Sequence, residues 1–502
     1  MSPNGLALPV VLPMLTGIAL ILLPRRAEWQ RRISAVSTAV GFLIAVALIR
    51  QVRAEGIQVL YVGDFPAPFG IVFVGDLLST LLVALNMLVA AAVLWYAFLT
   101  MDPERERFFF YPLFQFLLMG INGAFLTGDI FNLFVWFEVL LIASYILLTL
   151  GGEPYQLQEG FKYVMINMLA STLFLVSVSV LYGTLGTLNM ADMAVKIAEV
   201  KDSPVVAIAS VLLLIVFGIK AAIFPLYFWL PRSYVAPPGA VTAFFGGVMT
   251  KVGVYAMVRV YTLLFGVDDG FTYTLLVWIA GLSMVVGILG TLAQMDFKRI
   301  LTWHIISQIG YMVMGLAIFT PLALAGAIYY VAHIMVVKTA LFLASGVTEK
   351  LTGTTNLKKM SGLLTTHPAL GALFFVGGLS LAGVPPLSGF FGKFTLIQAG
   401  LAEGRYGIVA TAVGVSLFTL FSMIKIFRTS FWGEVRHKAA ADRAVDLRTY
   451  GALLGPLALL VAVSVGMGLG AQFTVGYVLE SAHQLLQPSL YIQAVLGSGL
   501  GS

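Results

Sequence analysis

Long apolar runs recur along almost the whole chain and are separated by short polar segments. An α-helix needs about 20 apolar residues to cross a hydrocarbon core of about 30 Å, and it satisfies its own backbone hydrogen bonds there. The pattern predicts an all-α polytopic membrane protein, a single transmembrane domain over residues 1–502. We place about fourteen spans at residues 5–23, 33–49, 73–99, 110–127, 129–150, 161–184, 205–226, 239–265, 272–293, 301–318, 321–345, 369–399, 406–430 and 450–471.

The composition agrees with a membrane protein and excludes several kinds of cofactor chemistry. Hydrophobic residues make up 60% of the 502 residues, charged residues only 10%, and the mean hydropathy is +0.97. The chain has no cysteine, which excludes disulfides, iron–sulfur ligation, thiol-linked haem and thiolate zinc sites. We expect neither a cofactor nor a bound metal.

The basic charge is spread in a way that indicates topology rather than a nucleic-acid partner. The net charge is +6, but the Lys and Arg residues are scattered in short loops and form no basic face or tail. Loops after odd-numbered spans hold roughly three times as many of them as the loops on the other side. The positive-inside rule then predicts that both termini face outward.

Several ionisable residues lie inside predicted spans. They are Glu138, Lys220, Lys251, Lys338 and Lys393, with His333 close by. A charge near the bilayer centre costs about 2.5–3.5 kcal/mol on insertion scales, and such residues commonly mark ion or proton paths. The pattern predicts a route for a small charged species.

Two of these lysines lie beside prolines that interrupt a span. Lys220 precedes Pro225, and Lys393 follows Pro385. A broken helix at membrane depth is tolerated where protein or a wet cavity satisfies the freed backbone groups, and breaks at corresponding positions of two halves indicate a transport site. The layout predicts N-terminal helices over 1–99, two inverted five-helix repeats over 110–265 and 272–430, and a C-terminal helix and tail over 450–502.

Six segments together resemble a known superfamily. They cover residues 128–145, 220–231, 249–255, 296–301, 333–342 and 383–393, and in this order they are similar to the antiporter-like subunits shared by Mrp multisubunit Na⁺/H⁺ antiporters and respiratory complex I. The sequence before Glu138 and the segment 229–238 are similar to D-type Mrp subunits. Lys393 stands where the M-type subunit of complex I has a glutamate. The resemblance implies other subunits of a hetero-oligomeric Mrp complex as partners, and the plasma membrane of a bacterium or archaeon as the location.

The resemblance also implies a proton relay, and physical arguments support it. Burial disfavours the charged forms of Glu138 and Lys220, whereas close approach favours both, so the two form a switchable pair. Lys251, then His333 or Lys338, would carry the proton to Lys393 as the exit. His333 and Lys338 lie five residues apart, about 140° around an ideal helix, and a π-bulge or a local break in that span would bring them closer.

We weigh three functions and predict the first of them. The first is the proton-translocating subunit of a cation/proton antiporter that drives sodium export. The second is a proton-pumping membrane subunit of a complex I-like dehydrogenase or membrane-bound hydrogenase. In the third, the chain is a scaffold whose buried charges only hold helices together; each relay residue also has such a structural interpretation, with Glu138 as a fixed partner of Lys220 and His333 as a packed core histidine.

Overall fold

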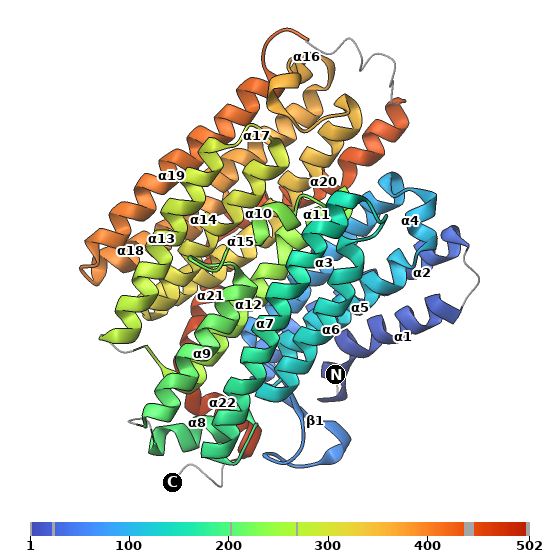
Figure 1. Ribbon diagram of the computed structural model, residues 1–502. Helices are drawn as coiled ribbons and strands as arrows, with labels where there is room; N and C mark the ends of the chain where they lie inside the picture. Colours follow the sequence, from blue (N-terminus) through green and yellow to red (C-terminus); the bar gives the residue numbers. More distant parts are fainter. Residues whose placement is uncertain (1–2, 23–25, 201–202, 268–269, 436–445, 498–502) are drawn as a thin grey trace.

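The computed structural model describes residues 3–22, 26–200, 203–267, 270–435 and 446–497. Helices dominate, and Figure 1 shows them packed as one bundle. Residue 23 of the first predicted span, the counted loop cations Arg25, Lys201, Arg436, Lys438 and Arg443, and residues 498–502 of the predicted tail lie outside the described residues.

The helices follow one another with few other elements. The first part of the chain forms η1 (Pro3–Ala7), α1 (Leu8–Leu22), α2 (Ala27–Glu55), β1 (Gln58–Tyr61), η2 (Val62–Asp64), β2 (Val72–Gly75), α3 (Leu77–Thr100), α4 (Pro103–Arg107), α5 (Phe110–Leu126), α6 (Ile130–Leu148), α7 (Pro154–Leu185), α8 (Met190–Glu199), α9 (Pro204–Ala221) and α10 (Leu230–Ser233). The next span is continuous and consists of α11 (Gly239–Phe244), the π-helix η3 (Phe245–Met249), α12 (Thr250–Val260) and the π-helix η4 (Tyr261–Phe265).

The remaining part continues in the same way. It forms α13 (Phe271–Ala293), α14 (Phe297–Ile318), α15 (Pro321–Thr352), η5 (Leu357–Lys359), α16 (Leu363–Thr366), α17 (Pro368–Ala382), α18 (Ser388–Ala402), α19 (Tyr406–Ile426), the π-helix η6 (Phe427–Phe431), α20 (Leu447–Leu469), α21 (Ala471–Leu485) and α22 (Pro488–Leu496). Among the described residues, twelve helical stretches are long and apolar enough to cross a membrane, and the shorter apolar helices α5 and α17 add two. These correspond one to one with the fourteen predicted spans.

Both predicted helix breaks are confirmed. Helix α9 ends at Ala221, and Ala222 adopts a left-handed conformation with φ 60°. The chain then passes Pro225 before α10 begins, so the helix ends five residues earlier than the predicted span. Helix α17 ends at Ala382, Gly383 has φ 91°, and α18 begins after Pro385 and Pro386. Glycine reaches such a φ without a steric penalty.

A matching pair of backbone contacts marks the internal repeat. Asp129, before α6, forms an isolated β-bridge with Asn189, and Asp296, before α14, forms one with Asn356. Each residue of the second bridge lies 167 positions after its counterpart in the first. The first bridge lies beside α8 and the second beside η5 and α16, at opposite ends of the molecule (Figure 1). The second set of helices is therefore inverted relative to the first.

Close glycine packing repeats with the same spacing. A Cβ at Gly120 of α5 would meet the backbone of Leu140 at 2.7 Å, and one at Gly287 of α13 would meet the backbone of Ser307 at 2.4 Å. Gly123 likewise lies against the ring of Trp136, and Gly290 against the ring of Trp303. Each helix hairpin is thus held by two glycines that admit the next helix. The exact division into repeats over 110–265 and 272–430 stays a prediction.

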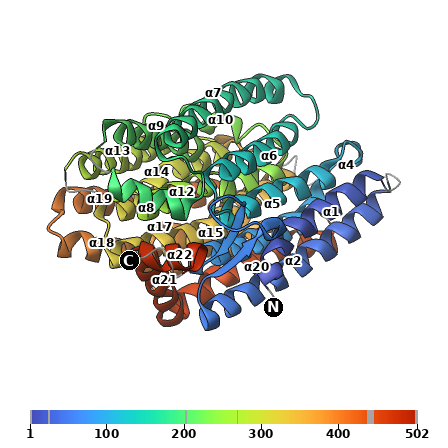
Figure 2. The same cartoon turned by 90° about the horizontal axis from the view of Figure 1, so that it is seen from below.

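The start and the end of the described chain lie at the same end of the bundle. Both η1 and α22 contact β1, whose hairpin partner β2 pairs with it antiparallel. Seen from that end, α8, α21 and α22 lie over the ends of the transmembrane helices (Figure 2). The opposite end carries α4 and α16 (Figure 1).

Candidate functional site

Glu138 and Lys220 meet through a third side chain. The hydroxyl of Ser171, on α7, donates to the carboxylate of half-buried Glu138, and the ammonium of Lys220 donates to the same hydroxyl at 3.4 Å. Lys220 is 5% exposed and also lies 4.8 Å from the ring centre of Phe137. Among the described residues, therefore, the predicted pair is linked by a hydroxyl and not by a direct ion pair. No sequence argument singled out Ser171.

Lys251 and Lys338 lie fully buried near the middle of the bundle. The ammonium of Lys251 donates to the carbonyl of Gly246 at 2.7 Å, inside the π-helix η3. The ammonium of Lys338 donates to the carbonyl of Leu301, on α14, at 3.0 Å. Both charges are therefore held by neutral backbone oxygens.

His333 connects to the second helix break. Its Nδ1 lies 2.7 Å from the hydroxyl of Ser388, the first residue of α18, and Nε2 has no hydrogen-bond partner among the described residues. Ser388, Ser380 and Ser464 form a ring of hydroxyls with oxygen separations of 2.8, 2.9 and 3.2 Å. The histidine therefore joins a chain of hydroxyls that links α15, α17, α18 and α20.

Neither a π-bulge nor a break lies between His333 and Lys338 in α15, which the structure describes along its whole length. Helix α15 is α-helical from Pro321 to Thr352. The two side chains therefore bind different neighbours: His333 is hydrogen-bonded to Ser388, and Lys338 to the carbonyl of Leu301. The described π-helices lie in η3, η4 and η6 instead, and η3 contains the carbonyl that Lys251 binds.

Lys393 reaches back across the break. Its ammonium donates to the carbonyls of Leu381 at 3.1 Å and Ala382 at 2.9 Å, and to the hydroxyl of Ser416 at 3.0 Å. Its Nζ also lies 5.1 Å from the ring centre of Tyr311. A cation at a helix C-terminus is favoured by the helix dipole and by the last, unpaired carbonyls.

A second buried histidine was missed in the sequence. His304 lies on α14, one turn after the carbonyl that holds Lys338, and its Nε2 is 2.6 Å from the hydroxyl of Ser422. Its Nδ1 has no partner among the described residues. One turn further along α14, Gln308 accepts a hydrogen bond from Tyr330. A titratable residue inside the predicted span 301–318 was the available signal for this polar face.

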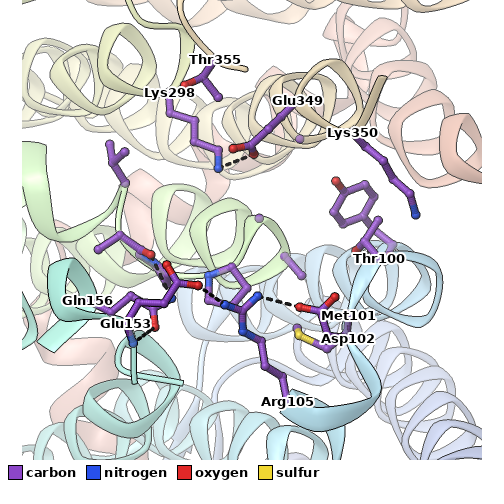
Figure 3. A pocket seen from close by; sticks show the side chains of 18 of the residues that line it. Thr100, Met101, Asp102, Arg105, Glu153, Gln156, Lys298, Glu349, Lys350 and Thr355 are labelled. Atoms are coloured by element: carbon purple, nitrogen blue, oxygen red, sulfur yellow. Dashed lines mark hydrogen bonds and ion pairs between the residues drawn. The ribbon is translucent and has the colours of Figure 1, made fainter. Parts of the chain in front are cut away.

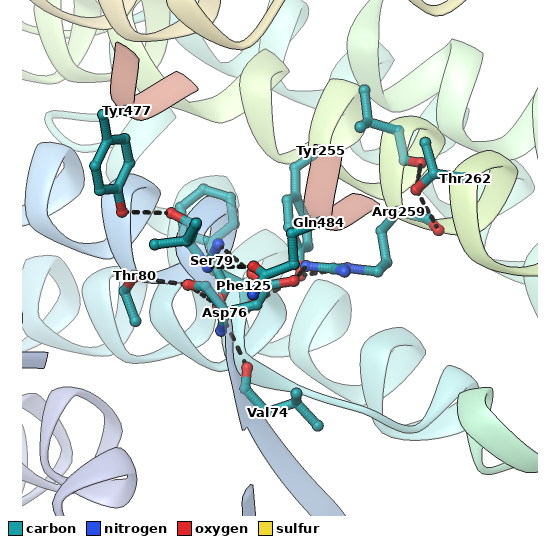
Figure 4. A network of polar contacts seen from close by, with 12 residues as sticks. Val74, Asp76, Ser79, Thr80, Phe125, Tyr255, Arg259, Thr262, Tyr477 and Gln484 are labelled. Carbon is teal, nitrogen blue, oxygen red and sulfur yellow. Dashed lines mark hydrogen bonds and ion pairs between the residues drawn. The ribbon is translucent and has the colours of Figure 1, made fainter. Parts of the chain in front are cut away.

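A buried ion pair was also missed. Arg259 donates to the carboxylate of Asp76 at the start of α3, and the two side chains are 4% and 2% exposed (Figure 4). The backbone amide of Ser79 donates to Asp76 at 2.8 Å, while Gln484 and Tyr477 of α21 bond the backbone of Leu77. In the comparison of Lys and Arg numbers between the two sides, Arg259 is counted as a cation at a span end. In the structure it lies inside the span Gly239–Phe265.

The four buried lysines of the candidate site bind neutral groups. In the part of the chain that the structure describes, Lys220, Lys251, Lys338 and Lys393 contact carbonyl and hydroxyl oxygens or aromatic rings, and the ion pairs found involve other cations. A buried lysine without a carboxylate partner loses its proton readily, unlike an arginine.

Comparison with known proteins identifies the family of the chain. The family model described as "NADH:quinone oxidoreductase/Mrp antiporter, TM" matches residues 127–419, more than half of the chain. The chain is 52% identical to the D-type Na(+)/H(+) antiporter subunit of Alkalihalophilus pseudofirmus, over 98% of this chain and 99% of that protein.

Solved structures give the same assignment. A chain of the Mrp complex from Dietzia sp. superimposes with a TM-score of 0.92 and 33% identity, over 99% of this chain and 100% of that one. A chain of respiratory complex I from Thermus thermophilus superimposes with a TM-score of 0.82 and 25% identity, over 97% and 100% of the two chains. The chain therefore belongs to the family of membrane subunits shared by NADH:quinone oxidoreductases and Mrp antiporters, and within it to the D-type subunits of Na⁺/H⁺ antiporters.

Proposed function

We propose that this chain moves protons through the buried residues Glu138, Lys220, Lys251, His333, Lys338 and Lys393, as part of a multisubunit antiporter that exports sodium. The observation that carries the proposal is the set of four buried lysines held by neutral oxygens. A scaffold would need these charges to be paired, because an unpaired buried charge is strongly unfavourable. A proton relay needs them to change protonation state.

In this relay, Ser171 couples Glu138 to Lys220. While the hydroxyl joins them, the carboxylate favours the ammonium form of Lys220. When that contact opens, Lys220 is left desolvated and passes its proton towards Lys251 and Lys338. His333 and its hydroxyl chain, or the polar face of α14, then lead to Lys393.

The family and the charge asymmetry support the following setting. The chain works with other subunits of an Mrp-type complex in the plasma membrane of a bacterium or archaeon, and the α4 and α16 end faces the cytoplasm. Both termini then face outward. Sodium and protons are the transported ions.

A redox-driven pump is the second candidate, because a chain of respiratory complex I shares this fold. The membrane chemistry would be the same, and electron transfer in other subunits would supply the energy.

Transport in inverted membrane vesicles that carry the complete complex separates the two. Sodium-dependent collapse of an imposed pH gradient, lost in an assembled Lys220→Ala complex, supports antiport through this chain. A pH gradient that is built by an electron donor and is indifferent to sodium moves the chain to the redox-driven class. Wild-type antiport in an assembled Glu138→Gln complex would remove Glu138 from the path.

A further inference from the structure

A basic cavity lies beside the end of α19, at the end of the molecule that carries α4 and α16. Its volume is about 670 Å³. Residues of α19 and η6 line one wall, and residues of η5 and the chain that follows it line the other. Helix η6 contacts both η5 and α16. The cavity therefore lies where the membrane span Tyr406–Phe431 ends.

Cations outnumber carboxylates three to one in the lining of this cavity. Lys358, Lys425 and Arg428 line it together with Glu434. The ammonium of Lys425 donates to two backbone carbonyls, at 2.9 and 2.6 Å, which carry no net charge. Within the described chain, the exposed side chains of Lys358 and Arg428 form no hydrogen bond or ion pair. The excess of positive charge attracts an anion.

Another cavity at the same end of the molecule has balanced charges (Figure 3). Its volume is similar, about 640 Å³, but three cations and three carboxylates line it. Arg105 bonds Asp102 at 2.8 Å and also bonds Glu153, and Lys298 bonds Glu349 at 2.6 Å. Such a cavity offers no net attraction for an anion. The excess of cations therefore distinguishes the cavity beside α19 from its counterpart.

An apolar surface adjoins the basic cavity. Ile424 lines the cavity and also a shallow apolar groove between α17 and α19, which lie side by side (Figure 1). The side chains of Phe375, Phe421 and Ile424 are 42%, 59% and 46% exposed. Trp432, 63% exposed, lines the cavity just after the span ends. Tryptophan is enriched at this level of a membrane protein, where its ring lies among lipid headgroups.

We propose that this cavity binds the headgroup of an anionic phospholipid, whose acyl chains lie along α19 and the groove between α17 and α19. Guanidinium and ammonium groups donate hydrogen bonds to phosphate oxygens. Basic pockets between transmembrane helices are a known way to bind anionic lipid headgroups. A free anion would use the cations alone, whereas a phospholipid also uses the tryptophan and the groove. The site does not depend on the proton relay, because no relay residue lines it.

Lipid binding to the complete complex tests the site. The complex is purified in detergent, depleted of lipid and titrated with phosphatidylglycerol or phosphatidylcholine, and native mass spectrometry counts the bound lipids. In the Lys358→Gln, Arg428→Gln double variant we expect one phosphatidylglycerol site to weaken about thirtyfold, because each cation near a membrane surface strengthens binding of an anionic lipid about fivefold. Phosphatidylcholine binding should not change.

The Lys359→Gln, Arg448→Gln double variant is the matched control. It removes the same charge from exposed side chains that do not line the cavity. We expect this variant to bind phosphatidylglycerol as tightly as the wild type. Equal weakening in both double variants would show a general effect of surface charge and would overturn the site.

Two other occupants of the cavity give different results. If inorganic phosphate displaces the bound phosphatidylglycerol at equal concentration, the cavity binds an anion and not a lipid. If the Lys358→Gln, Arg428→Gln complex loses another subunit while its lipid binding is unchanged, the cavity is a protein interface. Either result overturns the proposal.

A measurement on Trp432 keeps the test independent of assembly of the double variant. Phospholipids with brominated acyl chains quench the fluorescence of tryptophans that they contact. The difference in quenching between the wild-type and Trp432→Phe complexes reports on Trp432 alone. We expect brominated phosphatidylglycerol to quench it more strongly than brominated phosphatidylcholine at equal mole fraction. Equal quenching by the two lipids would mean that Trp432 contacts only bulk lipid, and the site would be wrong.

Discussion

The ammonium of Lys393 donates a 2.9 Å hydrogen bond to the carbonyl of Ala382, the last residue of α17, across the break that separates the two halves of this span. The lysine therefore stabilises the broken segment as well as lying at the end of the proposed relay. Its two roles can be separated by substitution.

Lys393→Arg is expected to keep the cap and abolish proton flux. A guanidinium still donates to the carbonyls of Leu381 and Ala382, but it does not release its proton in proteins. Lys393→Met removes both the charge and the cap, so it should also lower thermal stability. The measurement is proton flux and thermal unfolding of the purified complex for both variants. Normal flux in Lys393→Arg would show that this residue does not change protonation during transport.

Ser171→Ala should uncouple Glu138 from Lys220 without disturbing the fold. Hydrogen bonds to charged groups contribute about 1.5–3 kcal/mol, so we expect proton flux to fall roughly ten- to hundredfold. Ser171→Thr keeps the hydroxyl and should restore part of the flux. Ser177→Ala is the matched control, because that buried serine on the same helix bonds only the carbonyl of Leu173. Equal flux in both alanine variants would remove the hydroxyl from the relay.

The two histidines between Lys338 and Lys393 are expected to act in parallel. In each histidine, one ring nitrogen is hydrogen-bonded to a serine hydroxyl. The other ring nitrogen has no hydrogen-bond partner within the described chain. A glutamine side chain keeps a hydrogen-bonding group but cannot take up or release a proton as histidine does. We expect His304→Gln and His333→Gln each to slow proton flux and the double variant to abolish it. Complete loss in one single variant would place that histidine in series with the lysines.

The Asp76–Arg259 pair should matter for stability more than for transport. Removal of one partner leaves an uncompensated buried charge, which costs about 3–5 kcal/mol, so Asp76→Asn and Arg259→Met should each destabilise the complex. The Asp76→Asn, Arg259→Met double variant should regain much of that loss, because no charge is left unpaired. Thermal unfolding of the three variants measures the coupling. If the losses of thermal stability in the single variants add up in the double variant, the two side chains are not energetically coupled.

Hydropathy was sufficient to predict the spans but not what lies between them. The fourteen spans follow from apolar length alone, and the two breaks follow from Pro225 and Pro385, because proline cannot continue a helix. Asp76 and Arg259 are 183 residues apart, and Arg259 lies near a span end, where a cation usually reaches water. In the structure, α21 and α22 pack over that end: Gln484 bonds the backbone of Leu77, and Tyr491 lies against the guanidinium of Arg259.

The internal repeat was predicted from layout, although a residue pattern was present. Gly120, Gly123, Asp129 and Trp136 recur 167 positions later as Gly287, Gly290, Asp296 and Trp303, but of the residues between them only Ile121 recurs, as Ile288. The structure shows what these positions do in both repeats. The glycines allow the next helix to pack closely, and the aspartates cap the N-terminus of that helix. With the same spacing, Ser171 and Lys338 lie at equivalent positions of α7 and α15. The first repeat thus has a hydroxyl where the second has a charge.

The equivalent glycine–tryptophan contacts of the two repeats predict matched responses to substitution. Gly123→Ala and Gly290→Ala would each drive a methyl group into the facing tryptophan ring, and overpacking of this kind costs about 1–3 kcal/mol. We expect similar losses of thermal stability, because the two helix hairpins pack alike. Gly414→Ala on α19 is the control: nothing lies within 4 Å of the added Cβ, and alanine is favoured over glycine in a helix. A large loss at one tryptophan contact and none at the other would show that only one hairpin depends on this packing, so that the repeats share a layout without sharing its energetics.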